Sequence, residues 1–121
     1  MDLPRFPGCE EEATKEAKRS CADRQLMAFF YDHFQYPEND LAKVITGVVR
    51  ASFTVKVDGS ITDIKILQDI GAGCGMAVRE ALQAMPRSGI RFTPAKFWRG
   101  VKNITFQLKV TFNKGSVKIG A

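Results

Sequence analysis

The chain has 121 residues, 45% hydrophobic and 26% charged, a composition that indicates one globular domain and excludes a disordered chain. No apolar run approaches the roughly 18 residues of a membrane helix, and no signal peptide is visible at the start. The net charge is +5 and the last acidic residue is Glu80, so the basic C-terminal third either favours an anionic partner or is a solvated basic surface.

The first 21 residues are predicted to form an extended segment followed by a charged loop. Pro4 and Pro7 favour an extended backbone, and residues 10–19 are charged and either helical or loop-like. Cys9 and Cys21 enclose this charged stretch. In an oxidising compartment they could form a disulfide that stabilises the fold by about 3 kcal/mol, whereas in the cytosol they would stay reduced. The sequence does not decide between these two states.

A helix is predicted for residues 22–34. It is expected to end before Pro37, because the residue before a proline disfavours helical geometry. The apolar stripe of this helix consists of Leu26, Phe29, Phe30 and Phe34, which recur with helical spacing. His33 lies near the stripe and is expected to be a packed or surface residue, because no carboxylate or hydroxyl companion is evident. Residues 37–45 then predict a short second helix or a turn.

Residues 48–67 are predicted to form a β-hairpin. Apolar and polar residues alternate from Val49 to Val57, as in a sheet with one buried face, and Asp58-Gly59 is a strong signal for a tight turn. Ile61 breaks the alternation of the return strand, which predicts a bulge near residues 60–62. An isolated hairpin is only marginally stable in water, so this one needs further packing partners.

A second amphipathic helix is predicted for residues 75–85, with the proline that follows as its stop. Cys74 lies between two glycines just before it and is expected to be a small buried residue. Residues 87–100 are expected to be irregular. A final strand with alternating apolar residues is predicted for residues 102–112, and the tail, residues 113–121, is expected to be mobile or to form a short extra strand.

Together these elements predict an α+β domain with two layers: a three-stranded antiparallel sheet, made of the hairpin plus the C-terminal strand, covered by two helices. The domain spans residues 22–112, between the N-terminal segment 1–21 and the tail 113–121. No carboxylate pair, nucleophile–base pair or phosphate-binding loop is recognisable, and a single histidine leaves too few ligands for a zinc site. We therefore expect a binding domain with no catalytic site, metal or cofactor.

The order of elements and several strings resemble the TonB C-terminal domain family, from about Phe6 to Phe112. The matching strings are FPGC, YP, VVRASFTVKVDGSITDIKIL, GAGCGMAVREALQAMP, FTPA and a final VTF. The cysteines resemble a branch of the family common in periplasmic proteins. Two positions depart from the family pattern: Phe92 stands where a tryptophan is usual, and Lys109 where the final strand often has a proline. The lysine restores a hydrogen-bond donor to that strand or protects its edge by charge.

This resemblance implies a periplasmic protein-binding domain, joined to an inner-membrane anchor in the full-length protein. Such a domain grips a peptide segment of an outer-membrane receptor by β-strand addition and transduces energy for outer-membrane transport. The residues then expected to bind the peptide are Gln35, Tyr36, Pro37, Arg99, Lys102, Asn103, Thr105, Gln107 and Lys109. Arg99 and Lys102 would attract an acidic residue of the peptide. Tyr36 and Pro37 have an alternative role, which is to end the first helix.

The physical basis of this expectation is the final strand, which we predict at an edge of the sheet. Such an edge presents unpaired N–H and C=O groups to which a peptide can add as one more strand. Each backbone hydrogen bond contributes about 0.5–1.5 kcal/mol net, so a handful of them gives a transient grip. The same edge can pair two copies of the chain, which predicts a homodimer through the C-terminal strand in competition with the peptide.

Two alternatives stay open on the same scaffold: a sensor ectodomain, and a basic module that binds nucleic acid or cell wall. Phe92, Phe97 and Trp98 could provide a stacking platform for bases. The outward face of the final strand carries Asn, Thr, Gln and Lys instead of aromatic residues, so nucleic acid is not the expected partner. A sensor role is compatible with everything above, because a fold does not determine a function.

Overall fold

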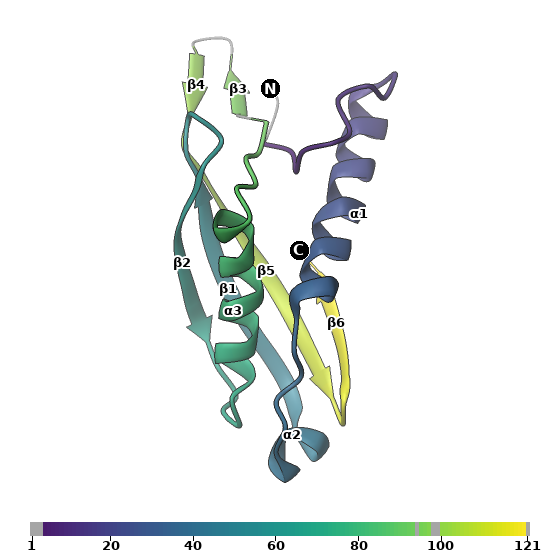
Figure 1. Ribbon diagram of the computed structural model, residues 1–121, viewed down its shortest axis with the longest axis vertical. Helices are drawn as coiled ribbons and strands as arrows, with labels where there is room; N and C mark the ends of the chain where they lie inside the picture. Colours follow the sequence, from purple (N-terminus) through teal and green to yellow (C-terminus); the bar gives the residue numbers. More distant parts are fainter. Residues whose placement is uncertain (1–3, 94, 98–99, 121) are drawn as a thin grey trace.

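The computed structural model describes residues 4–93, 95–97 and 100–120, and it confirms the α+β class. Helices α1 and α3 lie on the same face of one antiparallel sheet, and α2 lies at one end of it (Figure 1). The elements in chain order are α1 (Lys15–His33), α2 (Asp40–Val44), β1 (Thr46–Val55), β2 (Ile61–Gln68), α3 (Cys74–Arg87), β3 (Ala95–Phe97), β4 (Gly100–Lys102), β5 (Ile104–Asn113) and β6 (Ser116–Gly120).

The main sheet has four strands in the order β2-β1-β5-β6, instead of the three predicted. The additional strand is β6, so the tail forms the short extra strand that was one of its two expected states. Lys114 and Gly115 form the two-residue turn before it, with φ of 47° and 94°. A turn with two positive φ values matches the twist of a hairpin, which explains the tight return. The expectation that β5 is an edge strand is therefore wrong over the part that β6 covers.

The predicted hairpin forms β1 and β2, with the bulge slightly later than expected. Ser52 pairs with Lys65 and Thr54 with Thr62, so two residues of β2 oppose a single residue of β1. Asp63, with φ of 53°, lies in this irregularity. An aspartate tolerates the left-handed conformation better than the β-branched residues beside it, which explains why the bulge forms here.

The two long helices extend beyond their predicted bounds. Helix α1 starts at Lys15 instead of residue 22, because Thr14 caps it by accepting a hydrogen bond from the Ala17 N–H at 3.0 Å. Much of the predicted N-terminal loop is therefore helical. Helix α3 continues to Arg87 and includes Pro86 in its last turn. A proline so close to the end of a helix removes only one backbone hydrogen bond, which the helix tolerates.

Two shorter predictions had different outcomes. The segment after Pro37 forms a helix, α2, which Asn39 caps by accepting a hydrogen bond from the Ala42 N–H at 2.8 Å. Strand β3 lies in the loop predicted as irregular, and β4 runs from the last residue of that loop to the first residue of the predicted final strand, so β5 begins at Ile104 instead of residue 102. Strands β3 and β4 pair with each other in a separate two-stranded sheet. Their pairing between Ala95 and Lys102 is a local hairpin whose short strands carry too weak an alternation to predict.

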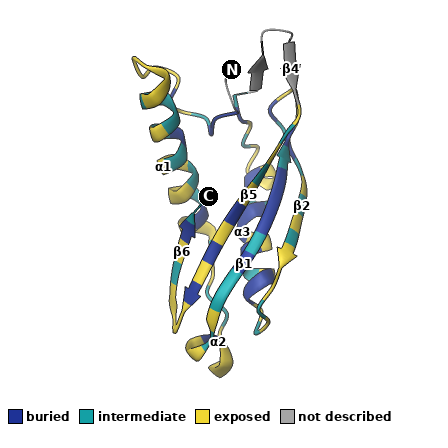
Figure 2. Ribbon diagram, turned by 180° about the vertical axis from the view of Figure 1, so that it is seen from behind, coloured by how far each residue is buried: buried dark blue, intermediate teal, exposed yellow. Residues whose placement is uncertain are grey.

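The core lies between the sheet and the two helices. Buried or half-buried residues alternate with exposed ones along β5 (Figure 2), and the exposed ones are polar. Phe53 and Phe112 of the sheet are fully buried, as is Phe30 of α1. Helix α3 buries a stripe made of Val78, Ala81, Leu82 and Met85. Burial of apolar side chains of this size contributes roughly 1.5–3 kcal/mol each, so this layer is the main source of stability.

The N-terminal segment attaches α1 to the rest of the domain. Cys9 and Cys21 form a disulfide with a Cα–Cα distance of 5.8 Å. Arg5 exchanges two backbone hydrogen bonds with Thr93, at 3.1 and 2.9 Å. The ring of Phe6 packs against Phe29 of α1 at 5.8 Å. These contacts connect α1, through the N-terminal segment, to the loop that follows α3.

Candidate functional site: an open stretch of β5 beside α1

Strand β5 has unequal neighbours on its two sides. On one side β1 pairs with it along its whole length, from Ile104 to Asn113. On the other side β6 pairs only with residues 109–113. Within the part of the chain that the structure describes, no strand lies beside residues 104–108 on that side, and Figure 1 shows β6 ending partway along β5. We call residues 104–108 the open stretch of β5.

The backbone groups that face this open side follow from the hairpin geometry. Asn113 and Ser116 flank a two-residue turn and therefore form a hydrogen-bonded pair. In an antiparallel ladder every second residue directs its N–H and C=O to the same neighbour. Counting back from Asn113, the residues that face β6 continue to Gln107 and Thr105. These two residues therefore direct their backbone N–H and C=O groups toward the open side.

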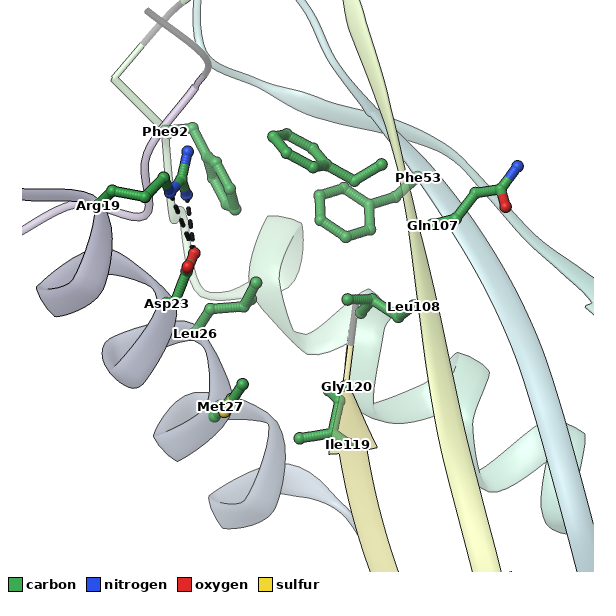
Figure 3. A pocket seen from close by; sticks show the side chains of 11 residues that line it. Arg19, Asp23, Leu26, Met27, Phe53, Phe92, Gln107, Leu108, Ile119 and Gly120 are labelled. Atoms are coloured by element: carbon green, nitrogen blue, oxygen red, sulfur yellow. Dashed lines mark hydrogen bonds and ion pairs between the residues drawn. The ribbon is translucent and has the colours of Figure 1, made fainter. Parts of the chain in front are cut away.

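An apolar groove lies between α1 and the open stretch (Figure 3). It encloses about 340 Å³, which is within the usual range for ligand pockets. Leu26 and Met27 come from α1, whereas Phe53 and Leu108 come from the sheet. The full lining consists of Arg19, Asp23, Leu26, Met27, Phe53, Phe92, Phe106, Gln107, Leu108, Ile119 and Gly120. An exposed cavity of this size with mostly apolar walls is suited to apolar side chains.

The charged groups of the groove are already paired. The Arg19 guanidinium donates to the Asp23 carboxylate at 2.9 and 3.2 Å and to the Pro4 carbonyl at 2.8 Å. Figure 3 shows this pair at the α1 side of the groove and the Gln107 side chain pointing away from it. Arg19 and Asp23 therefore line the α1 side of the groove as an ion pair and add no unpaired charge to it.

The outer edge of β6 is held by α1. The Ile119 N–H donates to the Tyr31 hydroxyl at 2.9 Å. Since β6 uses alternate residues to pair with β5, this N–H belongs to the opposite edge of the strand. Helix α1 thus fixes β6 in place at the point where the groove begins, and it leaves the open stretch as the accessible part of this side of the sheet.

The predicted strand residues have three different roles. Thr105 and Gln107 belong to the open stretch, as the strand-addition hypothesis requires. Lys109 pairs with Gly120 of β6, so its backbone is not available as predicted. Asn103 accepts a hydrogen bond from the Val57 N–H at 2.9 Å through its side-chain oxygen, which is a structural role at the start of β5.

The other predicted residues are not brought to the open stretch. Tyr36 lies at the opposite end of β5, where its hydroxyl donates to the Ala42 carbonyl and accepts from the Gly115 N–H at 3.2 Å. Gln35 and Pro37 line a shallow polar depression together with Tyr36. Arg99 lies outside the described residues, and Lys102 is described only as part of the β4 backbone.

Sequence reasoning missed the α1 wall of the groove. Leu26 appears in the predicted apolar stripe of the first helix, but Met27 follows it directly and widens that stripe toward solvent. Met27 is 37% exposed. This widened stripe was the available signal, although it does not specify what lies opposite.

Two features of the described residues bear on other functions. No group of three or more His, Cys, Asp or Glu side chains there is arranged to hold a metal ion. In the same ranges, no helix has the length and apolar character that crossing a membrane requires. His33, the single histidine, is exposed and stacks on Phe29 with 4.0 Å between ring centroids, as expected for a surface histidine.

Comparison with curated proteins and with solved structures gave no match. A family model described as the Gram-negative bacterial TonB protein C-terminal matches residues 32–113, more than half of the chain. Almost all of α1 and the whole of β6 lie outside this range. Domains of this family are periplasmic, non-enzymatic protein-interaction domains. The resemblance found in the sequence is thereby confirmed, and the chain belongs to the TonB C-terminal family.

Proposed function

We propose that this domain binds a peptide segment of an outer-membrane receptor by β-strand addition along the open stretch of β5. The observation that carries the proposal is the unequal pairing of β5, which leaves the backbone groups of Thr105 and Gln107 facing a side that β6 does not cover. An extended peptide satisfies such groups as one more strand of the sheet. Membership of a family whose domains bind outer-membrane receptors supports the choice of partner.

The strength of such a contact suits a transient grip. About four backbone hydrogen bonds, two at each of Thr105 and Gln107, contribute roughly 2–6 kcal/mol before the entropic cost of association. The peptide would therefore dissociate readily when no load is applied. A pull along the strand loads these bonds together, so the contact can transmit force from an inner-membrane anchor of the full-length protein to the receptor. Energy transduction for transport is the function that this arrangement supports best.

A second part of the proposal concerns self-association. The open stretch can pair with the same stretch of another copy, which would form a homodimer through β5. Such a dimer uses the backbone groups that the receptor peptide needs. Peptide binding and dimerisation are then mutually exclusive.

A proline substitution in the open stretch tests the proposal. Gln107→Pro removes one N–H that faces the open side and leaves the hydrogen bonds to β1 in place, because proline is tolerated where a strand faces no neighbour. We expect this variant to bind a receptor-derived peptide at least tenfold more weakly while its far-UV circular dichroism stays unchanged. Isothermal titration calorimetry gives the affinity.

Gln107→Ala is the matched control, because it removes the same side chain and keeps the backbone N–H. We expect its affinity to stay within twofold of the wild-type value. Equal affinities for the proline variant, the alanine variant and the wild type would rule out strand addition at this position.

A further inference from the structure

We infer that the groove between α1 and the open stretch selects the partner by its sequence pattern: it takes an extended peptide with apolar side chains at every second position. This inference rests on the proposed function and adds a specificity site to it. The pattern follows from three observations: the row that β6 occupies, the apolar lining of the groove, and the part of the chain that supplies its α1 wall.

The peptide is expected to continue the row of β6. Gly120 is paired with Lys109 and residue 121 follows it in the chain, so an antiparallel peptide in the same row starts opposite Gln107 at the earliest. The residues opposite Phe106 and Ile104 then come second and fourth. Side chains directly opposite each other in an antiparallel pair lie on the same face of the sheet. The second and fourth side chains therefore point toward the core face, where the groove lies, and the first and third point to the polar face.

The groove suits apolar side chains because its sheet side is aromatic and aliphatic. Phe92 and Leu108 are buried there, and Phe53 packs against Phe92 with 5.9 Å between ring centroids. On the α1 side, Leu26 and Met27 complete the apolar surface. A polar side chain placed in this groove would lose its hydration without finding an unpaired hydrogen-bonding partner. Its burial there is therefore much less favourable than the burial of an apolar side chain.

A second copy of the chain would not fill this groove. In a dimer paired through β5, the core-facing side chains brought to the edge are Phe106 and Leu108 of the second copy. Both belong to or pack against the core of their own molecule. A free peptide strand, whose side chains are not packed in a core of their own, is therefore the occupant that the groove fits.

The groove depends on segments that the family match does not include. Helix α1 supplies Leu26 and Met27, and β6 supplies Ile119, and all three lie outside residues 32–113. The specificity site is thus a property of this chain's additional elements, which are attached by the Cys9–Cys21 disulfide and the Tyr31 hydrogen bond.

The test uses the full chain and three acetylated, amidated peptides in an NMR titration that follows the amides of Thr105 and Gln107. The reference peptide is Thr-Val-Thr-Val, the second is Thr-Ser-Thr-Ser, and the third is the reference peptide N-methylated at both threonines. The protein variant is Met27→Asp on the wall of the groove. Its control is Met76→Asp, at an exposed methionine of α3 that does not line the groove.

We expect the reference peptide to bind at least tenfold more weakly to Met27→Asp than to the wild type, and within twofold of wild type to Met76→Asp. The serine peptide is expected to bind the wild type at least tenfold more weakly than the reference peptide. Because the peptide series uses the unaltered protein, this result does not depend on how well the variant folds.

Two outcomes separate the inference from the function it rests on. If N-methylation abolishes binding while the serine peptide and Met27→Asp both stay within twofold of the reference, strand addition stands and the specificity groove is wrong. If the N-methylated peptide binds as well as its parent, or no peptide binds, both proposals are overturned.

Discussion

A single glycine connects the predicted hairpin turn to the groove. Gly59 has φ of 86°, and the Phe92 N–H donates to its carbonyl at 2.8 Å. A Cβ at this position would collide with the backbone carbonyl of Phe92, so no other residue fits without moving the loop. Phe92 lines the groove, and it also packs against Phe6 with 5.6 Å between centroids. The turn thereby positions one wall of the candidate site.

The carboxylate of Asp58 in the same turn makes stability depend on pH. It accepts hydrogen bonds from the Ser60 hydroxyl at 2.6 Å and the Ser60 N–H at 2.9 Å, and Arg91 lies 3.4 Å away. These contacts, led by the Ser60 hydroxyl, lower the pKa of Asp58 from 3.8 to about 2. A lowered folded-state pKa stabilises the fold above the unfolded-state pKa, and this contribution is lost as the pH falls from about 4 to about 2.

We therefore expect the wild type to lose stability between pH 4 and pH 2 and Asp58→Asn to lack this component of the loss. Urea unfolding at a series of pH values measures it. Asp32→Asn, which removes the same charge from the exposed face of α1, is the control. An equal loss of unfolding free energy between pH 4 and pH 2 in Asp58→Asn and wild type would show that the turn contacts do not contribute to the pH dependence.

At the scale of elements, the position of α1 decides whether the groove exists. This helix is joined to the rest of the domain by the disulfide of Cys21, by the packing of Phe29 on Phe6, and by the hydrogen bond of Tyr31 to β6. Phe30 is fully buried, and Phe34 at the end of α1 packs against Phe112 of β5 with 6.0 Å between centroids. Residues 15–27 of α1, which include the groove residues, depend mainly on the disulfide and the N-terminal segment.

Removal of the disulfide is expected to destabilise the domain and loosen residues 15–27 of α1. For a separation of 12 residues, the entropy of loop closure predicts a loss of about 3 kcal/mol in the double variant Cys9→Ser/Cys21→Ser. Denaturant unfolding gives the change in free energy, and amide hydrogen exchange of residues 15–27 shows whether the helix opens. A loss below about 0.5 kcal/mol with unchanged exchange would contradict this role.

The remaining thiol does not complicate this experiment. Cys74 is fully buried, and burial, with a smaller contribution from Asp69, raises its pKa. A buried thiol with a raised pKa is a poor nucleophile. Cys74 is therefore expected to stay unmodified by alkylating reagents in the folded protein, and its modification reports global unfolding.

At the scale of the whole molecule, the edge of β5 that faces away from β1 is divided into a part that is paired with β6 and an open part. Residues 109–113 of β5 are paired with β6, which α1 holds in turn, whereas no described strand lies beside residues 104–108 on that side. This division limits strand addition to about five residues. It also limits a dimer through β5 to the same short stretch, which makes the dimer weak.

Competition between peptide binding and dimerisation through β5 is therefore measurable. We expect sedimentation velocity to show a dimer fraction that rises with protein concentration and falls when the Thr-Val-Thr-Val peptide is added. Gln107→Pro is expected to abolish the dimer, and Gln107→Ala to retain it. A dimer that persists in Gln107→Pro at wild-type levels would place the self-association on another surface.

The elements that the sequence determined are those with a strong local signal. Alternation from Val49 to Val57 and the Asp58-Gly59 turn specify the hairpin, and the string around the second helix specifies α3. The family follows from the order of these strings. Thr105 and Gln107, predicted to bind the peptide, lie in the open stretch, and their role in binding stays a prediction. The alternation of a strand shows which of its residues share a side.

The groove and the extent of the open edge were decided by tertiary structure. Whether β5 is an edge depends on Ile119 packing in the core and on Tyr31 holding β6, which are contacts between residues far apart in the chain. The α1 wall depends on a disulfide and on Phe6, whose partners cannot be deduced from spacing. A local pattern specifies which face of an element is apolar, but the packing of several elements at once determines which other element covers it.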